Sequence, residues 1–565
     1  MDRKNRVLRL AAAVIGVGAF SIALLRLAHT ETDLPERLYC TALAGSLAAF
    51  LAVLLGRLGS GFLIAGAVTG GLWLAGALKL AYLHEPLLAP DLVYFAGGST
   101  FDVIAHYPAM RDKCLAAIAG GLLLAVLVWR LESPAWWRSR RARAAACIGA
   151  ALPLLVLAWP QGPFRTVHAV DTWAFIEQAQ RNPMSTFLRS FSRMRVSAPA
   201  YAPGAADAFD WGAGAAVDAA PARRPDLVVV LEESTLDPRQ WTACAVPRCT
   251  FAMFEPDEAT AAAGPLRVHT YGGATWTSEF AFLAGMPHTL FGPAGIYAPY
   301  NLAPRVRRTL PRQLAALGYR TIALYPAPRH FVRAGDAYAE YGFDAFYDVE
   351  DLGFGDMWSV TDLDMVHALE SVIERERAAA PGRPLFVMML TMRQHGPHDA
   401  PIDDLPPPWN ERPAPSLGEA ANRALGNYLH RLHQSGEALA ELRRFLFGAG
   451  RPAALAHFGD HHPSFDGLEE TLARALPDGL SDGRSLTYYR IDSNFGAKAP
   501  AHRPLDIAFL AGLLLDAAGL PKDAYFEANA RLRERCGGRY ADCPDREMLA
   551  SYFAYVFGTL QAFAR

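Results

Sequence analysis

The chain has 565 residues, more than one ordinary domain holds, so two or three parts are expected. Its formal net charge is −2, from 54 basic and 56 acidic residues, and this balance gives no general reason to expect a nucleic-acid partner. Hydrophobic residues make up 52% of the chain. Long apolar runs gather in the first third, whereas the rest has the composition of a soluble globular protein.

Five apolar segments in the first third are each expected to cross a membrane, since a span needs about 20 mostly apolar residues. The first is not interpreted as a signal peptide, because no small-residue cleavage site follows it and further apolar spans do. Residues 1–160 are therefore expected to form a transmembrane domain of five helices. The five segments are Val7–Leu27, Leu38–Leu55, Phe62–Leu83, Cys114–Trp129 and Ala144–Trp159.

The charges between the spans predict their orientation, because cytoplasmic loops favour Lys and Arg. Basic residues precede the first span and lie between spans two and three and between spans four and five, whereas the other loops carry acidic residues. The N-terminus is thus expected inside, and the odd number of spans puts everything after about residue 160 outside. We expect a multi-pass protein of the cell inner (cytoplasmic) membrane with a periplasmic catalytic domain.

Cysteine usage agrees with an extracytoplasmic second part. Two close pairs, Cys244/Cys249 and Cys536/Cys543, lie in that part, and such pairs favour disulfide bonds there. A zinc cluster is less favoured, because the pairs lack the two-residue spacing of common zinc sites.

Residues 161–224 are expected to connect the two parts. Thr172–Arg195 has apolar residues at helical spacing with arginines between them, which indicates an amphipathic helix on the membrane surface or one docked on the soluble domain. Ser197–Arg224 is rich in Ala, Pro and Gly and is interpreted as a linker.

From residue 225 to the end, short apolar strands alternate with helical stretches, which predicts an α/β domain with a largely parallel sheet. The clearest strands are Leu227–Leu231, Arg320–Tyr325, Pro384–Met389 and Ala453–Phe458. Helices are predicted near Val306–Leu317, Asp362–Ala378, Glu419–Phe447 and Leu505–Ala518.

Polar residues directly follow three of these strands, where ligands of open α/β sheets bind. Glu232 and Glu233 follow the first strand, His395 follows the third, and Asp460-His461 follows the fourth. Carboxylate and imidazole together suit a divalent metal. A metal or base is also what a threonine hydroxyl, such as that of Thr275, needs to become a nucleophile.

Four motifs resemble the sulfatase-like branch of the alkaline phosphatase superfamily, and within it the lipoteichoic acid synthase type of phosphoglycerol transferase. They are Glu233-Ser234 at a strand end, the Gly-x-Thr-x-x-x-Glu-Phe segment Gly273–Phe280, His395-Gly396-Pro397, and Gly459-Asp460-His461. Their order, their spacing and the preceding five-span part make the resemblance specific. It implies an alkaline phosphatase/sulfatase-type fold for residues 225–565.

The resemblance also implies roles for single residues. By this resemblance Glu233, Thr275, Asp460 and His461 would bind one divalent metal ion. Manganese is the ion that the resemblance implies, with zinc or magnesium as alternatives, and Thr275 would be the nucleophile. His395 would contact the phosphoryl group or the leaving oxygen. Arg333 would grip the head-group phosphate, and His398 lies close enough in sequence to His395 to reach substrate.

The implied reaction moves a phospholipid head group, with phosphatidylglycerol as donor, to an extracytoplasmic glycan through a phosphothreonine intermediate. Tyr325 and Val332 stand where the Gram-positive synthases have a histidine and a tryptophan, so phosphoethanolamine is an alternative head group. A phosphodiesterase using water as acceptor and a non-catalytic glycan- or lipid-binding domain are further alternatives. A true sulfatase is disfavoured, because Thr275 cannot become formylglycine and no arginine lies four residues later.

Overall fold

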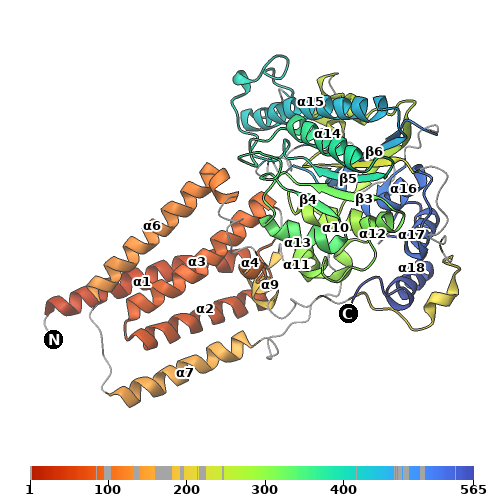
Figure 1. The fold of residues 1–565 in the computed structure, drawn as a ribbon. Coiled ribbons are helices and arrows are strands. Elements are labelled where there is room, and N and C mark those ends of the chain that lie inside the picture. Colours follow the sequence, from red (N-terminus) through yellow and green to blue (C-terminus); the bar gives the residue numbers. More distant parts are fainter. Residues whose placement is uncertain are drawn as a thin grey trace. The chain divides into compact units, whose positions relative to one another are not determined.

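The structure, a computed structural model, describes most of the chain: residues 3–83, 86–94, 103–132, 139–159, 181–190, 196, 198–212, 214 and 224–564, the last range without 245–246, 415, 464, 466–467, 469–471, 473, 475–482, 497–502 and 541. The chain divides into two compact units, Met1–Arg195 and Val196–Arg565 (Figure 1).

The first unit is built from five helices that are long and apolar enough to cross a membrane. Four of these helices each contain one of the predicted spans, and α7 contains the fifth apart from Trp159, so this part of the predicted fold is confirmed. The helices are α1 (Arg3–Thr30), α2 (Leu34–Leu55), α3 (Leu58–Leu83), α6 (Pro108–Leu131) and α7 (Arg140–Ala158). A short helix, α4 (Asp91–Tyr94), follows α3.

Helices α1 and α3 pack closely because glycines face each other at their contact. A side chain on Gly59 would overlap the backbone carbonyl of Ala12, and one on Gly16 would overlap the carbonyl of Gly59. Small residues let membrane helices approach in this way, which dispersion contacts then stabilise. At one end of the bundle the Glu132 carboxylate accepts hydrogen bonds from the backbone N–H groups of Gly59 and Ser60, which caps the start of α3.

Helix α9 (Pro183–Ser190) is the described part of the predicted juxtamembrane helix; the rest of Thr172–Arg195, apart from Arg181 and Asn182, lies outside the described residues. Its Met184 and Phe187 are buried in a cluster with Leu27 and Cys40 of the membrane helices. The described segment thus packs on the helical bundle, which neither sequence interpretation had anticipated.

The second unit contains one mixed eight-stranded sheet in the order β4-β3-β5-β1-β6-β7-β2-β8. Only β7 runs against the others. The strands are β1 (Asp226–Glu232), β2 (Thr260–Arg267), β3 (Arg320–Leu324), β4 (Ala345–Tyr347), β5 (Leu385–Leu390), β6 (Ala453–Gly459), β7 (Leu486–Ser493) and β8 (Leu505–Asp506). The central strands β1 and β5 are buried along their whole length and consist mostly of apolar residues, because helices cover both faces of the sheet.

Helices α14 and α15 cover one face of the sheet, and α10, α12, α13 and α16 cover the other (Figure 1). The predicted α/β fold is confirmed. The helices of this unit are α10 (Thr275–Ala284), α11 (Ala298–Asn301), α12 (Leu310–Ala316), α13 (Ala334–Tyr341), α14 (Asp362–Ala379), α15 (Glu419–Gly448), α16 (Leu510–Ala517), α17 (Ala524–Arg535) and α18 (Arg546–Phe553).

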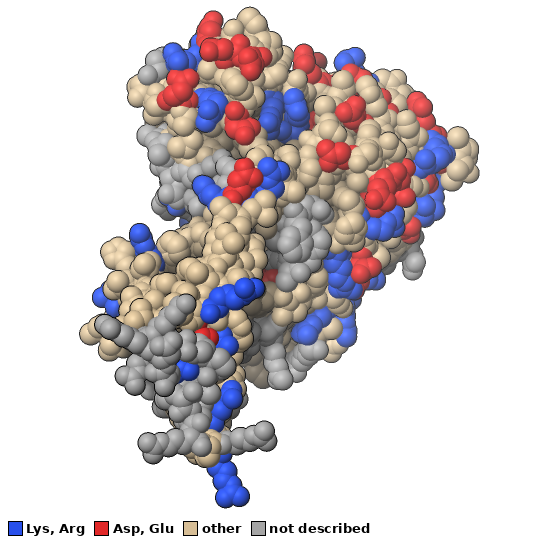
Figure 2. Space-filling model, turned by 90° about the vertical axis from the view of Figure 1, so that its left-hand side faces the viewer, with Lys and Arg blue, Asp and Glu red and all other residues tan. Residues whose placement is uncertain are grey.

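The surface of the second unit carries basic and acidic residues interspersed on the face that Figure 2 shows. That face has no broad region of one charge, in keeping with the near-zero net charge. The first unit is mostly neither basic nor acidic in the same view. Such a surface suits contact with lipid acyl chains.

Both predicted cysteine pairs are joined in the second unit, as Cys244–Cys249 and Cys536–Cys543. Within the predicted linker, residues 198–212 are described, and they pack onto the same unit. Trp211 is buried there, and its indole N–H donates to Ser551 Oγ at 3.1 Å.

Candidate metal and nucleophile site

Two neighbouring parallel strands deliver the acidic residues of the site. Strands β1 and β6 pair in register, with Glu232 opposite Gly459, so the residues that follow each strand meet at the same edge. Glu233 and Asp460 are these residues, and both are buried. Glu232 lies on the other side of the strand, where Thr391 Oγ1 donates to its carboxylate at 3.3 Å. The alternation of side chains along a strand therefore separates the two adjacent glutamates.

Helix α10 brings Thr275 to the same edge. Thr275 is its first residue, and Ala274 before it has φ +63°, a left-handed conformation that side chains other than glycine seldom adopt. The Thr275 hydroxyl donates to Glu233 Oε2 at 3.0 Å and lies 3.3 Å from His461 Nε2. The hydroxyl thus lies among the groups that could activate it.

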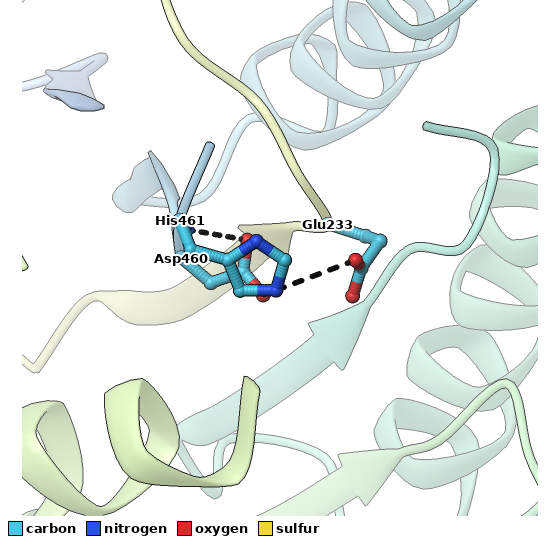
Figure 3. A group of neighbouring side chains, drawn as sticks. All are labelled: Glu233, Asp460 and His461. Atoms are coloured by element: carbon cyan, nitrogen blue, oxygen red, sulfur yellow. Dashed lines mark hydrogen bonds and ion pairs between the residues drawn. The ribbon is translucent and has the colours of Figure 1, made fainter. Parts of the chain in front are cut away.

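His461 presents a defined nitrogen to the site. Its Nδ1 lies 2.9 Å from the carbonyl oxygen of His462, which can only accept, so Nδ1 carries the hydrogen. Nε2 lies 3.1 Å from Asp460 Oδ2 and 3.5 Å from Glu233 Oε1 (Figure 3). A nitrogen lone pair beside two carboxylate oxygens is stable only with a positive charge between them, either a proton or a metal ion.

The carboxylates show the same requirement. Burial, and then repulsion from Glu233, raise the pKa of Asp460 to about 7. Burial opposes the ionisation of Glu233, yet the positive charge available on His461 and His395 holds its pKa below the usual value. The two neighbouring buried carboxyl groups of Glu233 and Asp460 therefore need a positive counter-charge.

The residues fit a divalent metal ion. Glu233, Asp460 and His461 offer ligand atoms within 4.8 Å of one another. Asp460 Oδ1 accepts backbone hydrogen bonds from Ser234 and His461 at 2.7 Å each, whereas Oδ2 accepts no hydrogen bond from any described residue. The orphaned oxygen faces the imidazole nitrogen, and with the Thr275 hydroxyl the donor set is three oxygens and one nitrogen.

One further group among the described residues has the composition of a metal site, His367, Glu370 and Glu441 on α14 and α15. It is partly or fully exposed, and exposed acidic groups are common without a metal. The buried group is therefore the candidate centre.

The three predicted substrate residues, His395, Arg333 and His398, have three different environments in the structure. His395 follows β5, and its Nδ1 bonds the Gly396 carbonyl at 2.8 Å. Arg333 is paired with Asp336 and Glu340, each at 3.0 Å.

His398 is buried between aromatic rings, and burial holds its pKa well below the usual value. Its Nε2 has no hydrogen-bond partner among the described residues. His395 is the one whose charge acts on Glu233, so of the three it is electrostatically tied to the centre.

Glu279 is a buried acid that the sequence interpretation left without a role. It lies four residues after Thr275, one turn along α10. Burial, followed by the charges of Asp460 and Glu233, raises its pKa to about 8. The helical spacing of four residues was the signal that could have found it.

The sheet order, the strand-end cluster and the threonine at a helix start define an α/β domain with a candidate metal and nucleophile site at one edge of its sheet. Residues 225–505 match the family model described as Sulfatase, so this part of the chain is similar to that family. An uncharacterised protein of Haemophilus influenzae is 33% identical over 349 residues, which are 60% of this chain. The chain spans 61% of the length of that curated relative.

Two solved structures are also similar to this chain. The phosphoglycerol transferase GacH of Streptococcus pyogenes, in complex with sn-glycerol-1-phosphate, is 17% identical with a TM-score of 0.47, over 66% of this chain and 99% of that chain. The lipooligosaccharide phosphoethanolamine transferase EptA of Neisseria meningitidis, an integral membrane protein, is 11% identical with a TM-score of 0.48, over 86% and 96% of the two chains.

Proposed function

We propose that the protein is a membrane-anchored, metal-dependent phosphoglycerol transferase that moves the head group of phosphatidylglycerol to an extracytoplasmic glycan. The observation that carries this proposal is the position of the Thr275 hydroxyl at the start of α10, within 3.0 Å of Glu233 and 3.3 Å of His461. A hydroxyl so placed is a nucleophile for phosphoryl transfer.

In this proposal Glu233, Asp460, His461 and Thr275 hold one divalent ion, with manganese proposed and zinc or magnesium as alternatives. When bound, such an ion lowers the pKa of a coordinated hydroxyl and polarises a phosphoryl oxygen. The chain itself contributes the rest. Glu233 Oε2, which accepts the Thr275 hydrogen bond, is placed to receive its proton.

The first chemical step forms a bond between Thr275 Oγ1 and phosphorus and breaks the bond from phosphorus to the diacylglycerol oxygen. The Thr275 proton passes to Glu233, and the leaving oxygen takes a proton from His395. The positive end of the α10 helix dipole lies at Thr275 and favours the negative charge of the phosphoryl oxygens.

The second step reverses these roles. A hydroxyl of the acceptor attacks the phosphothreonine, gives its proton to His395, and leaves Thr275 to regain its hydrogen from Glu233. Donor and acceptor thus react in turn at one position, which predicts ping-pong kinetics. We propose Arg333 and His398 as further substrate contacts, with Arg333 released from Asp336 and Glu340 when phosphate binds.

We also propose domain boundaries and a cellular location for the protein. Residues 1–160 form the transmembrane domain, 161–224 the connection and 225–565 the catalytic domain. The protein lies in the inner membrane with the catalytic domain in the periplasm, beside the leaflet that supplies the lipid donor. The acceptor is a glycan of the cell envelope.

The test supplies the full-length protein in detergent with phosphatidylglycerol labelled in its head group, and in parallel with labelled phosphatidylethanolamine. We expect diacylglycerol release with the first lipid and a head-group adduct on Thr275 in the mass spectrum. Thr275→Ala should lower turnover at least about 1,000-fold and abolish the adduct, whereas Thr275→Ser, which keeps the hydroxyl, should retain part of both.

The outcomes separate the alternatives. An adduct formed only from phosphatidylethanolamine would make the protein a phosphoethanolamine transferase. Free glycerol phosphate without transfer to added glycan would make it a phosphodiesterase. Full activity of the Thr275→Ala variant would remove the nucleophile assignment, and turnover of neither lipid would remove the donor assignment.

A further inference from the structure

The segment that carries His395 has no regular secondary structure. Strand β5 ends at Leu390, and residues 391–398 continue as turns and extended chain. Within this segment the His395 ring lies 5.0 Å from the ring of Trp358. A side chain on such a segment is held in place only if the backbone beneath it is held.

An arginine on the neighbouring helix α15 bonds the backbone on both sides of His395. Arg431, on α15, donates from Nη1 to the carbonyl oxygen of His395 at 2.8 Å and from Nη2 to that of Pro397 at 2.9 Å. Its Nη1 also lies 3.4 Å from the carbonyl oxygen of Arg393. The planar guanidinium thus joins three carbonyl groups, which a lysine ammonium with its single nitrogen cannot reproduce.

The same face of α15 supports the beginning of the segment. Gln434 lies three residues after Arg431, and its Oε1 accepts a hydrogen bond from Arg393 Nε at 2.8 Å. The backbone N–H of Arg393 donates to Asp362 Oδ1 at 3.2 Å. Ser435, the next residue along the helix, donates to the other oxygen of Asp362. One turn of α15 and the first residue of α14 therefore hold the beginning of the segment.

We propose that Arg431 is a positioning residue: it fixes the backbone on both sides of His395, so that the imidazole is presented to the phosphoryl group or the leaving oxygen. The inference rests on the proposed function for the role of His395, but the contacts that carry it do not. Arg431 itself touches no reacting atom in this proposal.

The kinetic test uses Arg431→Lys, which keeps the charge and loses the geometry. We expect kcat to fall about 10- to 100-fold with KM for the lipid changed less than about threefold, since a small misplacement of a catalytic group has effects of that size. Arg423→Lys, an exposed arginine on the same helix, is the matched control and should leave both constants unchanged.

A double-mutant cycle shows whether Arg431 acts through His395. If it does, the variant with both His395→Gln and Arg431→Lys is no slower than His395→Gln alone, because the second change removes support for a group already gone. Losses that multiply in the double variant would overturn the proposal. Full activity of Arg431→Lys would overturn it as well.

A measurement without any substrate keeps this test separate from the proposed function. Carbethoxylation of His395 by diethyl pyrocarbonate, followed by mass spectrometry, should change at least about threefold in rate in Arg431→Lys, whereas the exposed His433 should react unchanged. An unaltered His395 rate would overturn the proposal even if no lipid is turned over. Thermal midpoints and metal content equal to wild type exclude a general loss of structure as the cause.

Discussion

At Asp460 a proton and the proposed metal ion compete for the same buried carboxylate. Its pKa is raised from the ordinary 3.8 to about 7, first by burial and then by Glu233. Below pH 7 the metal-free protein therefore holds a proton on Asp460, which an incoming cation has to displace. Above pH 7 that proton has already left, and binding no longer depends on it.

We accordingly expect the affinity of the full-length protein for Mn²⁺ to fall as pH is lowered below about 7, by up to about tenfold per pH unit for one displaced proton. Calorimetric titration of the chelator-treated protein between pH 5.5 and 8.5 measures this. Asp460→Asn is the control and should bind weakly at every pH. An affinity constant across the range would contradict the assignment of Asp460 as the titrating ligand.

Some residues of the site could be predicted from the sequence and others could not. The motif order brought Glu233, Thr275, Asp460 and His461 together as one set, and the structure does place them within hydrogen-bond or metal-ligand reach. The opposite directions of Glu232 and Glu233 follow from strand alternation once the strand is known to reach Glu232. Arg431 could not be found in this way, because its contacts are to backbone carbonyls 34 to 38 residues away.

Helix α9 is the element whose role changes most once its contacts are known. It is fixed by polar groups as well as by its apolar residues: the backbone N–H of Met184 donates to Glu31 Oε1 at 2.8 Å. The Asn182 amide exchanges two hydrogen bonds with Asp33, at 2.7 and 3.0 Å. Arg189 pairs with the buried Glu36. Sequence periodicity showed that the helix is amphipathic, but it cannot say which surface the apolar side meets.

Replacing Asn182 with Ala should loosen this helix, because Asp33 would lose both partners that the amide provides. Each lost hydrogen bond weakens local structure by about 0.5–1.5 kcal/mol, because the Asp33 carboxylate is 39% exposed and can bond water instead. We expect trypsin to cleave the detergent-solubilised variant after Arg189 several-fold faster than wild type, as followed by mass spectrometry. Arg111→Ala, at an exposed site of the same unit, should not alter that rate. Equal cleavage of the Asn182→Ala variant would show that the amide does not hold the helix.

The ends of two predicted helices are set by a helix cap and by strand pairing, which the pattern of apolar residues does not show. The predicted helix Val306–Leu317 begins only at Leu310, since Thr309 caps it through a hydrogen bond to the backbone N–H of Arg312 and Pro311 occupies its first turn. The predicted helix Leu505–Ala518 opens instead as strand β8, and α16 follows from Leu510. Pairing of β8 with β2 decides this, and that pairing is not visible in the sequence.

At the scale of the whole molecule, the layout of five apolar helices followed by an α/β domain was predictable, because both depend on long runs of residue type. The orientation of the helices is a prediction from charge alone. Two exposed positions test it: Thr32, between α1 and α2, and Ser139, directly before α7.

In intact cells we expect a membrane-impermeant maleimide to label Thr32→Cys, whereas Ser139→Cys should be labelled only after the inner membrane is permeabilised. Cys114 and Cys147 are replaced by Ser in both variants to remove background. The reverse pattern would place the catalytic domain in the cytoplasm and would remove the proposed lipid leaflet and glycan acceptor with it.

The helix that begins with Thr275 lies deep in the α/β unit. From Thr277 to Ala284 every residue of α10 is buried, and Ser278 donates a hydrogen bond to the backbone carbonyl of Asp460 at 2.8 Å. Thr275 is therefore fixed relative to Asp460 by the packing of α10, and it cannot move toward a substrate. Selection of a substrate then depends on how well its phosphoryl group can line up with an immobile Thr275 Oγ1, and not on motion of the nucleophile.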